Sequence, residues 1–212
     1  WQIAVMKRFR RDGVKIKSSA QIDAMKAAGH LSAQALEVVG SLMRPGVSTA
    51  ELDAAAEKCI VEAGGTPAFK GYGGFPATIC ASVNDMVVHG IPSPDVILED
   101  GDVVSIDTGA IVDGWVGDNA ETFIVGTHDK QHQDLLSTTL AAMWAGIDQA
   151  FPGNHLGDVG HAIQKVIEDA GFNVIREYSG HGIGRRMHEP PNVLNYGVPG
   201  QGVKLEEGMV IA

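Results

Sequence analysis

The sequence is poor in cysteine, in long apolar runs and in positive charge. Its two cysteines, Cys59 and Cys80, lack CxxC spacing and are too few for a disulfide framework, so we expect a reducing, cytoplasmic location. No stretch of eighteen apolar residues occurs, which argues against a membrane protein. The 16 Lys and Arg residues against 26 Asp and Glu residues leave a formal charge of −10, which argues against DNA as a partner.

The remaining composition is that of a globular protein. With 212 residues, of which 44% are hydrophobic, the chain can form one sizeable domain or two small halves. Only residues 6–17 (MKRFRRDGVKIK) are basic. They could contact an anionic surface, but short basic segments are more often solvated tails. We interpret residues 1–17 as a basic N-terminal leader of this kind and residues 18–212 as a single domain.

Four helices are predicted from capping and apolar periodicity. Ser18 with Gln21 and Ser48 with Glu51 form capping-box patterns. The helices are expected at about residues 20–42, 48–63, 135–150 and 156–170.

The second pair of helices repeats the first at an offset of 107 residues. The recurring residues are Pro45, Gly46, Ala55, Lys58, Ile60, Ala63 and Gly64, matched by Pro152, Gly153, Ala162, Lys165, Ile167, Ala170 and Gly171. Positions inside the helices match as well as the helix ends, which favours an internal duplication over chance reuse of common stop signals.

A β-hairpin is predicted at residues 103–125, VVSIDTGAIVDGWVGDNAETFIV. If Asp113 and Gly114 form its two-residue turn, Asp107 and Asp118 lie on the same face of the hairpin. They are then diagonal neighbours about 7 Å apart at the backbone. Two carboxylates converge on one spot.

These two carboxylates need a positive charge, because like charges in a partly buried site repel each other. No Lys or Arg occurs anywhere in residues 103–125. A divalent cation with hard oxygen ligands would supply the charge. The alternative is that one aspartate faces solvent at a bulge and the other caps a turn.

Three of the eight histidines are candidates for the same site. His181 lies between glycines in GHGIG and could be a third metal ligand, although a histidine in such a context is more often a loop residue. His89 and His188 could donate hydrogen bonds to a substrate carbonyl, or could be core histidines bonded to backbone. We treat the remaining five as structural or surface residues: His30, His128, His132, His155 and His161.

A second hairpin is predicted with Asn84 and Asp85 as its turn, which sets Cys80 opposite His89. The simplest architecture is therefore α+β, with two α/β halves related by a pseudo-twofold axis. The aspartate hairpin would face the crevice between them.

Three stretches, taken together, resemble the type I methionine aminopeptidases, a metallopeptidase family with the pita-bread fold of creatinase-like enzymes. They are VNDMVVHGIPS (residues 83–93), SIDTGAIVDGWVGDNAETFIVG (105–126) and EYSGHGIGRRMHEPPNV (177–193). The resemblance implies two pseudo-twofold-related halves around a central metal cleft. It further implies a cytoplasmic monomer that removes the initiator methionine of nascent polypeptides when the second residue is small. The implied cofactors are two divalent ions (Co, Mn, Fe or Zn).

The resemblance also implies roles for individual residues. Asp107 matches a ligand of one metal, Asp118 the carboxylate that bridges both, and His181 a ligand of the other. His89 and His188 match catalytic histidines that contact the substrate. The positions that match the methionine pocket are Phe69, Tyr72, Phe75, Cys80 and Met187.

One departure from the family pattern concerns the metal ligands. The family completes its site with two glutamates, the first just beyond the dipeptide that resembles Gly208-Met209. Neither falls within the 212 residues. We therefore expect a catalytic domain incomplete at its C-terminal end, with weak metal binding and little turnover.

Two other functions stay open. A prolidase or aminopeptidase P shares the fold and metal ligands but acts next to proline. A metal-free pita-bread protein would bind peptides or RNA, yet every ligand position that these residues reach is kept, and the acidic balance disfavours RNA. Whether the basic leader contacts the ribosome is also open.

Overall fold

The computed structural model describes residues 13–127 and 129–212, so His128 and most of the basic leader lie outside the described residues. The chain divides into two compact units. One comprises residues 23–137 and 184–187 and is called the aspartate unit. The other comprises, within the described residues, 13–22, 138–183 and 188–212, and is called the histidine unit.

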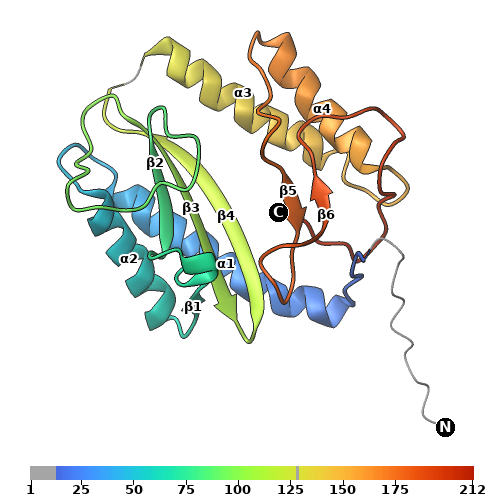
Figure 1. Ribbon diagram of the computed structural model, residues 1–212, viewed down its shortest axis with the longest axis horizontal. Helices are drawn as coiled ribbons and strands as arrows, with labels where there is room; N and C mark the ends of the chain where they lie inside the picture. Colours follow the sequence, from blue (N-terminus) through green and yellow to red (C-terminus); the bar gives the residue numbers. More distant parts are fainter. Residues whose placement is uncertain (1–12, 128) are drawn as a thin grey trace. The chain divides into compact units, whose positions relative to one another are not determined.

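The elements of the aspartate unit are most of α1 (Ser19–Leu42), α2 (Thr49–Glu62), β1 (Thr66–Pro67), the 3₁₀ turn η1 (Tyr72–Gly74), β2 (Ile79–Val83), β3 (Val103–Val112) and β4 (Trp115–Ile124). Those of the histidine unit are most of α3 (Lys130–Ile147), α4 (Leu156–Asp169), β5 (Gly180–Gly182) and β6 (Glu189–Val193). The prediction of four helices is confirmed, and the fold is of mixed α and β type (Figure 1).

The helix starts follow the capping signals. At α1, Ser18 N–H donates to Gln21 Oε1 and Gln21 N–H donates to Ser18 Oγ, at 3.0 and 3.3 Å. The predicted start of α3 at residue 135 is wrong by five residues. Asp129 accepts a hydrogen bond from His132 N–H at 2.8 Å, and this bond starts the helix earlier than its apolar periodicity indicates.

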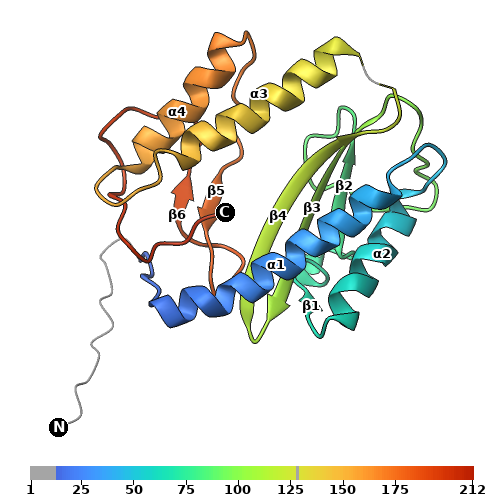
Figure 2. The ribbon, with the colours of Figure 1, turned by 180° about the vertical axis from the view of Figure 1, so that it is seen from behind.

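The sheet of the aspartate unit is built around β3. Strand β4 pairs antiparallel with its whole length, while β2 and β1 pair with it at residues 104–108 and 110–111. Helices α1 and α2 lie on one face of this sheet (Figures 1 and 2). Apolar side chains of both helices and of β2 and β3 form the core there, with Leu52, Ile60, Ile79 and Ile106 fully buried.

The histidine unit has a smaller core, in which Leu156 and Val159 of α4 pack with Val193 of β6 and with Leu205. Strands β5 and β6 form a two-stranded antiparallel sheet with a bulge between His181 and Gly182.

The end of the basic leader differs from the solvated tail that we expected. Val14 and Lys17 are only 3% and 7% exposed, so the chain is already packed into the histidine unit before α1 begins. No helix in the described part of the chain has both the length and the apolarity that a bilayer crossing requires.

Candidate active site

The β3–β4 hairpin has the register that its turn predicts. Asp113 and Gly114 both have positive φ, 49° and 73°, as a type I′ turn requires. Gly109 pairs with Asp118, so Asp118 and Asp107 lie on the same face as Gly109 and are diagonal neighbours. The predicted placement of the two carboxylates on one face is confirmed.

The electrostatic environment of these carboxylates is negative. Burial raises the pKa of the neighbouring Cys80 thiol to about 12, with Asp107, Asp118 and Asp53 adding to the effect. Neither β3 nor β4 contains a Lys or Arg that could balance the pair. Carboxylate oxygens without a basic side chain on their own hairpin form a donor set that suits a hard divalent cation.

The predicted pairing of Cys80 with His89 is wrong. Cys80 pairs with Asp107, because β2 joins the edge of β3 instead of forming a hairpin of its own. The turn at Asn84 exists, with φ of 56°, but no strand comes directly after it. The Asn84 side chain instead bonds Asp102 and the N–H of Val103. His89 lies on this exposed loop, also with a positive φ, 61°.

Apolar side chains pack beside the two aspartates. A Cβ atom added to Gly109 would lie 3.0 Å from Phe69 Cε1, from Met187 Cε and from the Cβ of Ala68. Phe69 and Met187 therefore reach the side-chain face of Gly109, the face that carries Asp107 and Asp118. Met187 is 5% exposed. The absence of a side chain at position 109 lets these apolar side chains pack against the face that carries the carboxylates.

The other predicted pocket residues are placed less closely. Cys80 is buried on β2 beside Asp107. Tyr72 is half-exposed on η1, and Phe75 follows that turn. Both belong to the aspartate unit, but neither is seen to contact Gly109 in the way that Phe69 does.

A clamp on the hairpin tip was missed by the sequence reasoning. Arg185 lies 4.0 Å above the ring centroid of Trp115 and donates to the carbonyl of Asp113 at 2.6 Å. Val116 N–H donates to Gly184 O at 2.9 Å. These contacts attach residues 184–187 to the hairpin. They thereby hold Met187 close to Gly109. The Arg in GIGRRM, close to an apolar residue, was the only signal for it in the sequence.

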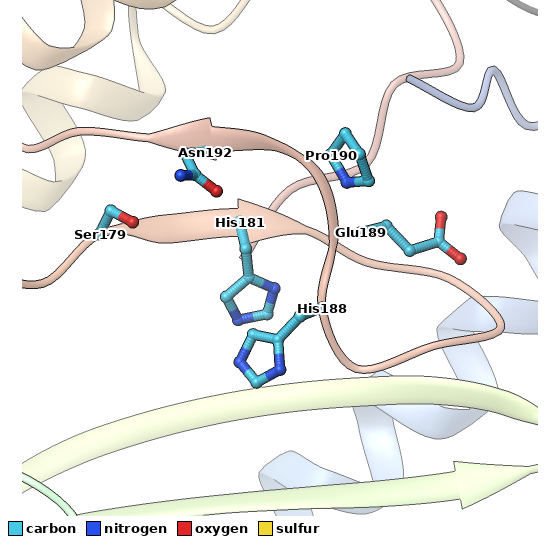
Figure 3. A pocket seen from close by; sticks show the side chains of 6 residues that line it. All are labelled: Ser179, His181, His188, Glu189, Pro190 and Asn192. Atoms are coloured by element: carbon cyan, nitrogen blue, oxygen red, sulfur yellow. The ribbon is translucent and has the colours of Figure 1, made fainter. Parts of the chain in front are cut away.

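In the histidine unit, His181 and His188 face each other. Their ring centroids are 4.3 Å apart, and both line a cavity of about 350 Å³ with Ser179 and Asn192 (Figure 3). His181 Nδ1 lies 3.0 Å from the Gly182 carbonyl. A carbonyl can only accept, so the proton of this bond is on Nδ1; in the neutral ring Nε2 then carries the lone pair with which a histidine binds a metal.

Four of the other histidines are described. His30 and His161 are exposed on α1 and α4, His132 is half-buried on α3, and His155 precedes α4. Within residues 13–127 and 129–212, no three His, Cys, Asp or Glu side chains form a group with metal-site geometry. Each unit instead holds one pair, two aspartates or two histidines.

Comparison with known proteins decides the family. Residues 23–212 match the sequence model of metallopeptidase family M24. The chain belongs to metallopeptidase family M24. This M24 chain is 46% identical over 197 residues to the methionine aminopeptidase of Clostridium acetobutylicum, a match that covers 93% of the chain and 79% of that protein.

Solved structures agree with this M24 assignment. The crystal structure of methionine aminopeptidase from Rickettsia prowazekii superimposes with a TM-score of 0.91 at 41% identity, covering 93% of the chain and 79% of that structure. The prolidase from Pyrococcus furiosus gives 0.81 at 26% identity, covering 92% and 56%. The fold is therefore the pita-bread fold, and the M24 chain is a metallopeptidase whose cofactors are divalent metal ions.

Proposed function

We propose that this chain is a methionine aminopeptidase, which removes the initiator methionine from nascent polypeptides when the second residue is small. The observation that carries the proposal lies within the aspartate unit: the side chains of Phe69 and Met187 pack beside Gly109 on the face that presents Asp107 and Asp118. Apolar side chains beside metal-binding carboxylates suit a peptidase that recognises an apolar N-terminal side chain.

We propose that Asp107, Asp118 and His181 would hold two divalent ions. Oxygen and imidazole donors suit Mn, Fe, Co or Zn. The Nδ1–H···O=C bond of His181 supports its role, because it orients the ring and keeps the lone pair on Nε2. We propose one catalytic domain from residue 18 onward, built from both units.

Divalent ions in such sites lower the pKa of bound water and polarise the scissile carbonyl. The chain's own histidines then act on the substrate. We propose that His89 and His188 donate hydrogen bonds to the peptide and to the charge that develops on its carbonyl oxygen. His188 is exposed at the cavity and His89 is exposed on its loop, so both side chains are accessible.

Phe69 and Met187 supply the apolar contacts for the methionine side chain, and Cys80, Tyr72 and Phe75 complete its pocket. Cys80 serves as a small apolar wall, since a thiol with a pKa of about 12 stays protonated and inert at neutral pH. We further propose that the protein is a cytoplasmic monomer. Val14 and Lys17 are buried in the fold, so their side chains are not available for contact with the ribosome.

A prolidase is the competing function, because the prolidase structure shares the fold. Higher identity and coverage with methionine aminopeptidases favour the first proposal. A metal-free binding module is disfavoured because Asp107, Asp118 and His181 are all retained.

The test measures free methionine released from Met-Ala-Ser, in parallel with cleavage of an X-Pro peptide, at a large excess of Mn²⁺. We expect faster turnover of Met-Ala-Ser and complete loss of activity on chelation. The excess is needed because metal binding by these residues is expected to be weak. Faster turnover of the X-Pro peptide than of Met-Ala-Ser would overturn the assignment.

The matched variants are Asp118→Asn and Asp113→Asn. The first removes a proposed ligand, and its effect should exceed the roughly 100-fold loss that an outer-shell partner causes. The second changes a carboxylate of the same hairpin at the exposed turn, where Asn also tolerates positive φ, and should stay within about twofold of wild type. Equal losses in both would show that the hairpin, and not the ligand, matters.

A further inference from the structure

A buried cluster of charges fastens the N-terminal segment to β6. Glu189 accepts hydrogen bonds from Lys15 Nζ at its Oε1 and from Lys17 Nζ at its Oε2, at 3.0 and 3.3 Å. The Glu189 side chain is 1% exposed and that of Lys17 is 5% exposed, while Lys15 covers the outer side at 46%. Each carboxylate oxygen therefore has its own lysine.

Burying these charged side chains costs free energy, so the cluster is expected to have a specific role. Burial lowers the pKa of Lys17. Burial also acts to raise the pKa of Glu189, but the hydrogen bonds and charges of Lys15 and Lys17 outweigh it and hold that pKa below its ordinary value. Buried ion pairs of this kind often add little net stability compared with apolar side chains of the same size. A geometric role explains the cluster better than a contribution to stability does.

The geometry connects the cluster to the candidate site. Glu189 begins β6 and pairs with Gly182, and it directly follows His188. His188 lies in the bend just before the strand. Figure 3 shows that the Glu189 carboxylate is directed away from the imidazoles of His181 and His188. A carboxylate fixed on the inner face therefore fixes the rotation of the backbone that carries His188 on the other.

The lysine side of the cluster is equally well anchored. Lys17 N–H donates to the Gly208 carbonyl at 2.8 Å, and a Cβ on Gly208 would lie only 2.5 Å from the Lys17 carbonyl oxygen. The backbone of residue 17 is thus held against residue 208 within the same unit, and its ammonium group gives Glu189 a fixed partner.

We propose that Glu189, held by Lys17 and Lys15, is a positioning residue that keeps the imidazole of His188 facing His181 across the cavity. Its consequence for catalysis rests on the proposed function, but the positioning itself does not. Glu189 is not a catalytic residue, because its enclosed carboxylate is already bonded by two lysines.

The experiment uses the full chain labelled with ¹³C-histidine, without metal or substrate. The measured quantity is the nuclear Overhauser effect between the rings of His181 and His188. We expect it in wild type and in Lys17→Arg, which keeps the charge, and expect it to be lost in Lys17→Met and Glu189→Gln. Lys165→Met removes an exposed i,i+4 ion pair with Asp169 and serves as the matched control that keeps the signal.

A single variant leaves a buried charge unpaired and could fail to fold. The double variant Lys17→Met with Glu189→Leu removes both charges at similar volume. We expect it to give a cooperative thermal transition but no ring–ring signal, since apolar contacts do not impose one direction. Retention of the signal in this folded double variant would overturn the proposal.

Kinetics provide the second measurement. With Met-Ala-Ser and excess Mn²⁺, kcat of the double variant should fall about 10- to 100-fold with KM little changed, while Lys17→Arg stays near wild type. A lower melting temperature with unchanged kcat would also overturn it. If wild type cleaves the X-Pro peptide faster than Met-Ala-Ser yet the ring–ring signals match the expected pattern, the proposed function fails and the positioning role stands.

Discussion

The two units share a repeated helix geometry but differ in the residues proposed for chemistry. Helix α2 runs over Thr49–Glu62 and α4 over Leu156–Asp169, so both ends are displaced by the same 107 residues. Both helices end on an alanine followed by a left-handed glycine, Gly64 and Gly171, with φ of 81° and 83°. The duplication predicted from the sequence is matched by the helix geometry.

The correspondence extends to connections outside the helices. Leu98 N–H donates to Val47 O at 2.8 Å in one unit, and Leu205 N–H donates to Asn154 O at 2.7 Å in the other. These pairs are again 107 residues apart. The segments VILEDGD and VKLEEGM that contain the two leucines were not recognised as part of the repeat. Comparing the whole chain with itself at this offset would have found them.

The units diverge in the strands that come after each helix pair. The aspartate unit continues into a long hairpin with two carboxylates on one face, and the histidine unit contains a short bulged ladder with two imidazoles. The repeated parts are caps, turns and packing positions, whereas the residues proposed for chemistry lie in the parts that differ. The repeated helix pairs are therefore compatible with different strands after them.

The largest expected difference between the two units is in the cost of removing a core side chain. Ile60 on α2 is fully buried, while its counterpart Ile167 on α4 is only partly buried. Ile60→Ala should lower the free energy of unfolding by about 2–5 kcal/mol, because it leaves a cavity in a packed core. Ile167→Ala should cost clearly less. Urea denaturation followed by circular dichroism measures both, and equal costs would show that the two units are packed alike.

A smaller effect is expected at the helix starts. Glu51 accepts a bond from Ser48 N–H at 2.8 Å, and its counterpart Asp158 accepts one from His155 N–H at 2.7 Å. Asp158 alone also accepts from Gly200 N–H, at 2.8 Å. Changing either residue to Ala should lower the melting temperature by less than Ile60→Ala does, because only the N-cap N–H loses its acceptor and no core cavity forms.

Hydrogen exchange separates these two variants. Asp158→Ala should speed exchange of the Gly200 amide, because that amide loses its acceptor, while Glu51→Ala should leave it unchanged. Faster exchange in both variants would contradict the assignment of this bond to Asp158.

Local signals explain which features could be predicted. The register of the hairpin followed from one dipeptide, Asp113-Gly114, because a type I′ turn determines every pair of the adjoining strands. The partner of β2 could not be predicted in this way. It is β3, about twenty residues further on, and tertiary packing selects it over the nearby turn at Asn84.

Local sequence also does not predict the burial of a charged side chain, because its partner can lie far along the chain. Lys17 ends a basic run that is typical of a solvated segment, and only the position of Glu189, far along the chain, makes its burial tolerable. The pairs Asp107–Asp118 and His181–His188 show the same division. The first follows from one hairpin, whereas the second joins His181 of β5 to His188 just before β6, and no local turn motif predicts that these two rings face each other.

The smallest effect concerns the pH dependence of the two capping carboxylates. Hydrogen bonds from the backbone of Ser48 hold the pKa of Glu51 below its ordinary 4.5, and bonds from His155 and Gly200 hold that of Asp158 below 3.8. The folded state therefore binds these protons less readily than the unfolded state. The stabilisation is present above the ordinary pKa values and is lost as the pH falls through the lowered ones. Carbon-detected NMR titration of the folded protein should give midpoints below 4.5 and 3.8, and midpoints at or above them would show that the shared caps do not retain the charged form.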